Sequence, residues 1–359
     1  MTDTRTPVQV EVHAGMDAVR AALDTGVGDL VGPERTSPWS VDREFYRPEL
    51  RVAFQDGHPV AAVLTTGRPA TAATTLVEPW WTSAPALAAL VDDVVDWARR
   101  RGDVALKWST TEEIPEVAID AGFVPLTAPL GAVGTEGVRG AVRWFADIPH
   151  REPGYYAQTT MFTCGAVAAL MGAPLRDADG FAGDRDDRAR ELEYWRRASN
   201  YPACEPVGLA VATAEYLGTK AIEVALDAEG PVLVEGYDHF DLSFRTELQA
   251  ESRRRAGELG LVQRSERVAV AEIARRVADG ELALLLIDEA PMHGEHGPHW
   301  VLAHASDGSE VVIVEDPWVN RDTGETWVDT HELPIALADL NRLVRWSDAG
   351  YRGVVFIGR

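Results

Sequence analysis

One cysteine, one histidine, one aspartate and one glutamine could together carry out nucleophilic chemistry at a carbonyl group. Cys164 precedes Gly165 at the start of an apolar segment that is typical of a helix. Free backbone N–H groups and the helix dipole at such a position stabilise a thiolate. His299 could serve as the base beside this sulfur, and Asp316 could hold the imidazole in one tautomer. Gln158 could offer its amide N–H to a developing oxyanion, so the set predicts acyl transfer through a thioester.

A tight hairpin is expected to bring His299 and Asp316 together. Residues 299–305 and 311–316 are two largely apolar segments on either side of Asp307-Gly308. Asp-Gly between apolar strands is typical of a two-residue type I′ turn. Counting outward from such a turn places His299 directly opposite Asp316, with Cβ atoms roughly 4.5–5.5 Å apart.

Composition and charge restrict the classes of protein to which the chain can belong. With 359 residues, 46% hydrophobic and 25% charged, it has the size of two domains and the composition of a globular protein. The formal net charge of −23 argues against nucleic acid as a partner, because such binding depends on Lys and Arg. No run approaches the roughly 20 apolar residues of a membrane span, and the N-terminus lacks the apolar core of a signal peptide. Two cysteines form no disulfide framework, so the reducing cytoplasm is the expected location.

A polar segment rich in Pro and Gly at residues 149–154 predicts a boundary between a domain at 1–150 and a domain at 151–359. In the first domain, Asp56-Gly57 predicts a hairpin, and Gly102 after three arginines predicts the end of a long helix. The predicted strands cover residues 8–12, 51–54, 60–65, 74–77, 104–108 and 141–148, and the helices cover 86–101 and 114–121.

This first domain resembles the GNAT acetyltransferase fold, an α/β fold, over residues 8–148. The resemblance rests on the order of its elements and on the helix followed by Gly122-Phe123-Val124. That family binds the acetyl-CoA pyrophosphate on a glycine-rich turn that opens its main helix. Here the corresponding residues 77–85 contain no glycine, two tryptophans and two prolines. The departure predicts a degenerate domain, kept for packing or docking, that binds no acetyl-CoA.

The second domain has a different pattern, with helices first and a sheet after them. The predicted helices cover residues 163–170, 184–197, 207–217, 241–257 and 270–278, and the strands cover 221–226, 262–264, 282–288 and 354–357 beside the hairpin. The charge-rich helix 184–197 is interpreted as a solvated surface, and helix 241–257 as amphipathic. A helical part that carries the cysteine, followed by an antiparallel sheet that carries the histidine, is the layout of a papain-like α+β hydrolase.

Residues 155–359 also resemble the C39-like cysteine peptidases, specifically the stand-alone peptidase C39-like proteins of bacteria. The resemblance implies that Cys164 is the nucleophile, His299 the base, Asp316 its orienting partner and Gln158 the oxyanion donor. It also implies a peptide or protein substrate, and the leader peptides cut by bacteriocin-exporting members make a precursor peptide one expectation. One departure is Ala166, where the family usually has proline. The matching motifs are Gln158…Cys164-Gly165-Ala166, Pro206-Val207-Gly208, Pro298-His299-Trp300 and Asp316-Pro317.

Other residues with chemical potential are interpreted as structural. His293, His296 and His299 recur at intervals of three, but the glycines and the proline between them predict a loop without fixed ligand geometry, so no metal and no cofactor are expected. Cys204 is interpreted as a passive loop residue. His304 is expected to face away from His299, because it lies an odd number of positions along the strand. The late tryptophans Trp300, Trp318 and Trp346 are expected in the core, and Trp318 is kept as a candidate for the wall of a cleft.

The sequence therefore predicts a cytoplasmic cysteine peptidase that hydrolyses a peptide or amide bond. Three alternatives stay open: a cysteine-dependent acyltransferase with the same triad, a non-catalytic peptide-binding protein, and an N-acetyltransferase. The substrate, the cleavage site and the oligomeric state are left undefined by the sequence.

Overall fold

The computed structural model describes residues 7–198 and 203–359, so the first residues of the segment searched for a signal peptide lie outside the described part. The chain forms two compact units, each a sheet with helices, which confirms the predicted α+β class. The second unit consists of Pro129–Val133, Ile148–Val319 and Thr330–Arg359, and the first holds the rest, including Asn320–Asp329. The main passage between the units, after Asp147, lies next to the predicted boundary at residue 150.

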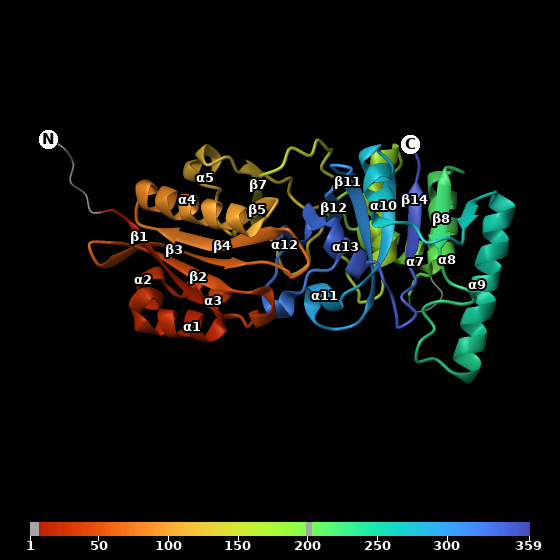
Figure 1. Cartoon of the computed structure of the whole chain (residues 1–359), viewed down its shortest axis with the longest axis horizontal. Coiled ribbons are helices and arrows are strands. Elements are labelled where there is room, and N and C mark those ends of the chain that lie inside the picture. Colours follow the sequence, from red (N-terminus) through yellow and green to blue (C-terminus); the bar gives the residue numbers. More distant parts are fainter. Residues whose placement is uncertain (1–6, 199–202) are drawn as a thin grey trace. The chain divides into compact units, whose positions relative to one another are not determined.

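The first unit is built on a seven-stranded sheet in the order β1-β2-β3-β4-β5-β7-β6. Its neighbours pair antiparallel except β4 and β5, which are parallel. Figure 1 shows α4 and α5 on one face of this sheet and α1, α2 and α3 on the other. The bounds are β1 Gln9–Ala14, α1 Met16–Ala22, α2 Gly28–Val31, α3 Pro33–Ser40, β2 Glu49–Gln55, β3 His58–Thr66, β4 Ala73–Trp81, α4 Ala84–Arg101, β5 Ala105–Thr110, α5 Glu116–Asp120, β6 Val124–Pro125 and β7 Arg139–Trp144.

Helix α4 has the position and the stop signal that the sequence predicts. The Ser83 hydroxyl accepts a hydrogen bond from the Ala86 N–H at 3.4 Å, which satisfies one free donor of the first turn. Gly102 closes the helix with a φ of 86°, a left-handed conformation that glycine adopts at little cost. The apolar stripe on its inner face, Leu87, Leu90, Val91, Val94, Val95 and Ala98, is buried against the sheet.

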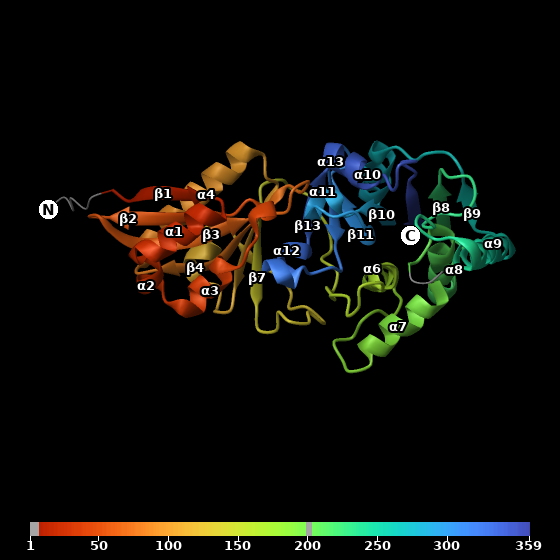
Figure 2. The ribbon, with the colours of Figure 1, turned by 90° about the horizontal axis from the view of Figure 1, so that it is seen from below.

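The second unit holds another seven-stranded sheet, in the order β13-β12-β11-β10-β14-β8-β9, in which β8 and β9 are parallel and the other pairs antiparallel. Figure 2 shows α6 and α7 on one side of its central strands and α10 and α13 on the other. The bounds are α6 Cys164–Gly172, α7 Asp187–Ala198, α8 Pro206–Leu217, β8 Ile222–Leu226, α9 His239–Leu259, β9 Val262–Arg264, α10 Val270–Ala278, β10 Leu282–Asp288, α11 Ala290–His293, β11 Pro298–Ser306, β12 Val311–Glu315, β13 Leu333–Ala336, α13 Leu337–Leu343 and β14 Gly353–Ile357. Helix α12, Trp327–Thr330, lies between β12 and β13 in the chain, but all of it except Thr330 belongs to the first unit.

Two helices of this unit differ from their predicted surfaces. Helix α7 is not simply a solvated face, because Asp187, Glu191 and Tyr194 on one side of it are buried. Helix α9 buries the polar side chains of Arg245 and Gln249, so the prediction of an amphipathic helix with an apolar inner face is wrong. In both helices these buried residues recur every three or four positions. They are polar, so a search for apolar residues at helical spacing does not find them. Across the described part of the chain, the helices lack the combination of length and apolar character that crossing a bilayer requires.

Candidate active site

Cys164 is the first residue of α6, directly after the N-cap residue Thr163. All nine residues of α6 are buried, and the Cys164 residue is 8% exposed. The predicted helix start is therefore confirmed, and Cys164 belongs to the first turn, whose backbone N–H groups have no partner within the helix.

Gly165 allows α6 to approach β11 closely. A Cβ atom at this position would lie 3.1 Å from Trp300 Cδ1 and 3.2 Å from the Cys204 Cβ atom, tighter than ordinary contacts. Trp300 is 1% exposed, as the prediction of a core residue requires, and its indole N–H donates to the Cys204 carbonyl at 2.9 Å. A side chain at residue 165 would push α6, and Cys164 with it, away from the strand that carries His299.

His299 lies between Asp316 and Cys164. Its Nε2 is 2.7 Å from Asp316 Oδ1, and the Cys164 side chain lies close enough to the imidazole to help raise its pKa. Burial of His299 favours the neutral ring, but the charges of Asp316 and Glu289 outweigh burial and hold the His299 pKa well above its usual range. Asp316 is fully buried, and its Oδ1 also accepts the Trp318 backbone N–H at 2.8 Å. Asp316 is thereby fixed to accept from the imidazole, which stabilises the imidazolium form.

The strand register that led to this pair is wrong, although the side chains meet. Ser306 pairs with Val312 rather than Ser309, and His299 pairs with Ile287 of β10. Asp316 lies beyond the end of β12 and reaches the imidazole from outside the ladder.

The loop after β11 explains the error. The Asp307 Oδ1 atom accepts the backbone N–H groups of Ser309, Glu310 and Val311 at 2.9, 2.8 and 3.0 Å. Burial opposes ionisation, but these three donors lower the pKa of Asp307. The carboxylate thus accepts hydrogen bonds from the backbone of a longer loop. A two-residue turn would not bring these three N–H groups to it.

Glu289 is a second carboxylate at the imidazole, and the sequence reasoning missed it. Its Oε1 lies 3.4 Å from His299 Nδ1, on the ring edge opposite Asp316. Pairing of Asp288 with Pro298 places the end of β10 beside the start of β11, which brings Glu289 to this position. An acidic residue directly after an apolar strand that precedes the histidine strand was the available signal.

Gln158 lies next to the aspartate through its backbone. Its N–H donates to the Pro317 carbonyl at 2.9 Å, and its side-chain Nε2 donates to the Thr160 carbonyl at 2.8 Å. The Oε1 atom is buried and has no partner among the described residues. One of the two amide hydrogens is thus committed to Thr160.

Glu191 of α7 holds the segment between Gln158 and Cys164. Its carboxylate accepts the Thr159 N–H at 2.9 Å and the Thr159 hydroxyl at 2.7 Å, and it also accepts the Thr163 hydroxyl. Glu191 is fully buried, and such a group needs these donors to offset its desolvation. The charge-rich sequence of α7 hid this role, because one buried carboxylate among many exposed ones has no distinct pattern.

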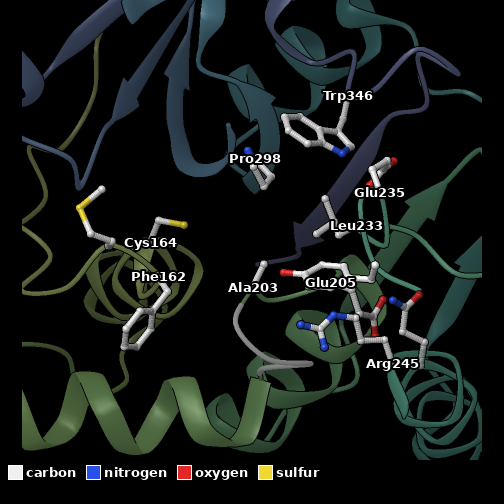
Figure 3. A pocket seen from close by; sticks show the side chains of 12 residues that line it. Phe162, Cys164, Ala203, Glu205, Leu233, Glu235, Arg245, Pro298 and Trp346 are labelled. Atoms are coloured by element: carbon white, nitrogen blue, oxygen red, sulfur yellow. The ribbon is translucent and has the colours of Figure 1, made fainter. Parts of the chain in front are cut away.

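A cavity of about 320 Å³ borders the Cys164 sulfur. Figure 3 shows Cys164 and Phe162 on one side of it and Leu233, Glu205, Glu235 and Arg245 across from them. The polar part of the wall is firmly held, because Arg245 lies 3.7 Å from the centre of the Tyr237 ring and Gln249 hydrogen bonds both backbone groups of Val232. The full lining is Met161, Phe162, Cys164, Ala203, Glu205, Leu233, Glu235, Tyr237, Arg245, Gln249, Pro298 and Trp346.

The remaining sequence candidates lie as follows. Trp346 lines the cavity rather than the core, so its prediction is wrong, and Trp318 is not part of the lining. His296 is 2.7 Å from Asp288 through Nδ1, while His299 faces Asp316, so these two histidines do not converge. Cys204 is 2% exposed, and burial, together with the charges of Cys164 and Glu205, raises its pKa well above the usual range.

A comparison with family models matches residues 153–358, more than half of the chain, to a family described as "Peptidase_C39 like family". No curated protein matches the chain.

Solved structures similar to the chain include three acetyltransferases. The IAA acetyltransferase from Bacillus cereus is 12% identical, with a TM-score of 0.26 over 39% of this chain and 100% of that one. Aminoglycoside 6'-acetyltransferase type Ii is 13% identical, with a TM-score of 0.31 over 40% and 100%. The GNAT domain of S. lividans PAT is 16% identical, with a TM-score of 0.27 over 38% and 90%. The matched part is the N-terminal region, and likeness of this extent says nothing about its activity.

Proposed function

This chain belongs to the Peptidase_C39 like family, and we propose that its second unit is a cysteine peptidase that hydrolyses peptide or amide bonds. The observation that carries the proposal is the contact series from Asp316 through His299 to Cys164 at the wall of a cavity. A buried carboxylate, an imidazole with a raised pKa and a thiol at a helix start are the parts of an activated nucleophile. A peptide-binding protein without chemistry would need the cavity but none of these three groups.

In the proposed reaction, the Cys164 thiolate attacks the substrate carbonyl carbon, and the carbonyl oxygen takes up the negative charge. The second amide N–H of Gln158 and the backbone N–H of Cys164 stabilise this oxyanion. His299 donates its Nδ1 proton to the leaving amine as the C–N bond breaks, which leaves a thioester on Cys164. Water then attacks the thioester and gives a proton to His299, and the free acid leaves the Cys164 thiolate.

Selective alkylation tests whether the nucleophile is activated. Iodoacetamide near pH 6 is expected to modify Cys164 and to leave Cys204 unmodified, because Cys204 is buried and its pKa is raised. Peptide mapping by mass spectrometry locates the adduct. Cys204→Ala is the matched control and should keep the labelling, whereas His299→Gln should lose it. Absence of labelling at Cys164 in the unaltered chain would reject the peptidase and favour a binding protein.

A peptide library then tests the reaction itself. Incubation is expected to yield new carboxyl and amino termini and a transient thioester on Cys164, both detected by mass spectrometry. A library drawn from precursor peptides covers the substrate class that the family resemblance suggests. Addition of a free amine should leave the carboxylic acid product unchanged; conversion of that acid to an amide would identify an acyltransferase instead.

Glu289 is expected to set the alkaline limit of activity. The reaction needs protonated His299, so activity falls as the pH rises through the His299 pKa. Glu289 helps to raise that pKa, and Glu289→Gln removes its charge, so the alkaline limb of kcat/KM should move to lower pH. Glu295→Gln, an exposed change in the same loop, is the control and should leave the profile in place. An unchanged alkaline limb in Glu289→Gln would contradict this assignment.

Trp346 is expected to contribute to substrate binding rather than to the chemical step. It lines the cavity, and its indole N–H is buried without a partner among the described residues. Trp346→Ala should raise KM about 10-fold or more with a smaller effect on kcat, because ring burial stabilises the bound substrate. Trp346→Phe keeps an aromatic ring and removes the N–H, so the difference between the two variants separates packing from hydrogen bonding. A fall in kcat at constant KM would show that Trp346 acts otherwise.

A further inference from the structure

A second group of titratable side chains lies buried in the same unit and has no part in the proposed reaction. His304, Glu315 and Glu332 bring one ring nitrogen and two carboxylate oxygens within 4.8 Å of one another. Their side chains are 0%, 0% and 2% exposed. Buried charges of this kind are rare unless they are paired or coordinate an ion.

A β-bulge directs His304 into this group. Ala303 pairs with Val314, and Ala305 pairs with Ile313. Two consecutive residues of β12 therefore face three residues of β11, and the extra residue is His304. A bulge re-aims the side chain of the extra residue. Glu332 approaches from the residue before β13, with a backbone φ of 54° that non-glycine residues rarely adopt. Unfavourable backbone geometry at a buried polar residue is typical of functional sites.

Two of the three side chains in the group have polar atoms without a hydrogen bond to any described residue, whereas Glu315 Oε1 accepts the Glu332 backbone N–H at 3.2 Å. Neither ring nitrogen of His304 has a partner of acceptable geometry among the described residues, and neither does Glu332 Oε1. His304 Nε2 is 3.1 Å from Glu315 Oε1, where the angles do not suit a hydrogen bond, and 3.8 Å from Glu332 Oε1, which is too far for one. The nitrogen therefore lies within 4 Å of both carboxylates without a hydrogen bond to either.

The second oxygen of each carboxylate is held from outside the group. His331 Nδ1 donates to Glu315 Oε2 at 2.6 Å, and His150 Nε2 donates to Glu332 Oε2. His331 also donates through Nε2 to Glu152 at 2.9 Å. Besides His304, which must be neutral to bind a metal ion, two histidines face three carboxylates, so one negative charge is left for a cation to neutralise. Outer partners that orient the ligand carboxylates are a regular feature of metal sites.

We propose that His304, Glu315 and Glu332 bind a divalent transition-metal ion of the zinc class. With bonds of about 2.1 Å, ligand separations of 3.1 and 3.8 Å correspond to angles of roughly 95° and 130° at the ion, on either side of the tetrahedral value of about 109°. Small side-chain rotations suffice to bring all three atoms within the ~4.2 Å that two such bonds can span. The imidazole ligand favours zinc and its neighbours over magnesium or calcium.

The site is structural, because it is closed to solvent and therefore to a substrate. Glu315 directly precedes Asp316 at the end of β12, and Glu332 directly precedes β13, so the ion joins the two ends of the segment that begins with the proposed catalytic aspartate. The residues come from positions far apart in the sequence, which is why the regular spacing of His293, His296 and His299 drew attention to a different place.

Metal content measured on the full chain tests the proposal without any assay of activity. All samples carry Cys164→Ser, so that the thiol takes up no zinc. After treatment with EDTA, exposure to excess Zn²⁺ and desalting, about one equivalent of zinc should remain per chain, and melting should occur roughly 5–10 °C higher than without metal. Co²⁺ in place of Zn²⁺ should give visible d–d absorption bands.

Matched variants locate the ion. His304→Gln and Glu332→Gln should each lose the retained zinc and the thermal shift, while His296→Gln, an exposed histidine change, should keep both. Circular dichroism reports whether each variant is folded, and the Co²⁺ bands of the parent chain stand even if one variant is not. Zinc retained by both folded variants, or no zinc retained by the parent chain, would overturn the proposal and leave a metal-free charge cluster.

Discussion

Replacing His299 by glutamine is expected to lower kcat/KM by about 10⁴-fold or more. His299 contacts Asp316 at 2.7 Å, and its pKa responds to the nearby Cys164 side chain, so it lies between the carboxylate and the thiol. A glutamine side chain can form hydrogen bonds there, but it cannot take up a proton and later deliver it to the leaving amine. Initial rates on a cleaved library peptide, together with the rate of thioester formation in a single turnover, measure the loss.

Two further variants serve as comparisons for the loss of activity in His299→Gln. His296→Gln removes an exposed imidazole in the preceding loop and should leave the rate unchanged. Asp316→Asn should be less damaging than His299→Gln, because an amide oxygen still accepts the imidazole N–H while the charge that supports the imidazolium is gone. A His299→Gln chain that keeps more than about a hundredth of the original rate would show that another group serves as the base, since general acid–base catalysis typically contributes 10²–10⁴-fold.

Replacing Glu191 by glutamine is expected to lower both stability and activity. The Glu191 carboxylate accepts N–H and O–H groups from Thr159 and Thr163, and a glutamine would turn its own NH2 donors toward some of them. Hydrogen bonds to a buried charge are worth about 1.5–3 kcal/mol each, so the free energy of unfolding should fall by roughly 3 kcal/mol or more. Displacement of Gln158 along with this segment should cost up to about 10²–10³-fold in kcat.

Urea unfolding and steady-state kinetics measure the two effects separately. Glu193→Gln is the matched control on the same helix, because Glu193 is half exposed and pairs with Arg196 and Arg197 on the surface. Its effect on stability should stay within about 1 kcal/mol, as for other surface ion pairs. Equal effects of the two substitutions would mean that Glu191 does not hold the segment before Cys164.

The same dipeptide succeeded as a turn signal at one hairpin and failed at another. Asp56-Gly57 forms the predicted two-residue turn, with φ values of 51° and 78° and with Gln55 paired to His58. At Asp307-Gly308 only the glycine has a positive φ, because the Asp307 carboxylate caps three backbone N–H groups of a wider loop. The hydrogen bonds of the Asp307 side chain therefore determine the type of loop. The residue types alone do not show which backbone groups that side chain will bind.

The sequence predicted elements and the residues at their ends better than it predicted partners from distant segments. Cys164 at a helix start and His299 at the start of a strand follow from local signals, namely a glycine-flanked apolar helix and an apolar strand after a loop. Glu289, Glu191 and Trp346 were missed or misplaced, because their positions depend on the pairing of β10 with β11 and on the packing of α7. Those contacts join segments that are separated along the chain, and a single sequence carries no direct record of them.

The segment Asn320–Asp329 folds with the first unit although the residues on both sides of it belong to the second. Within that unit, Glu325 forms a two-pronged ion pair with Arg68 at 2.6 and 2.7 Å, and Trp327 and Val328 are at most 1% exposed. A chain that begins at residue 151 would lack Arg68. The Glu325 carboxylate would then have lost its ion-pair partner, and Trp327 and Val328 would be exposed to water. Removal of the N-terminal residues is consequently expected to disturb the second unit as well, because the segment that joins Asp316 to Glu332 completes its folding within the first unit.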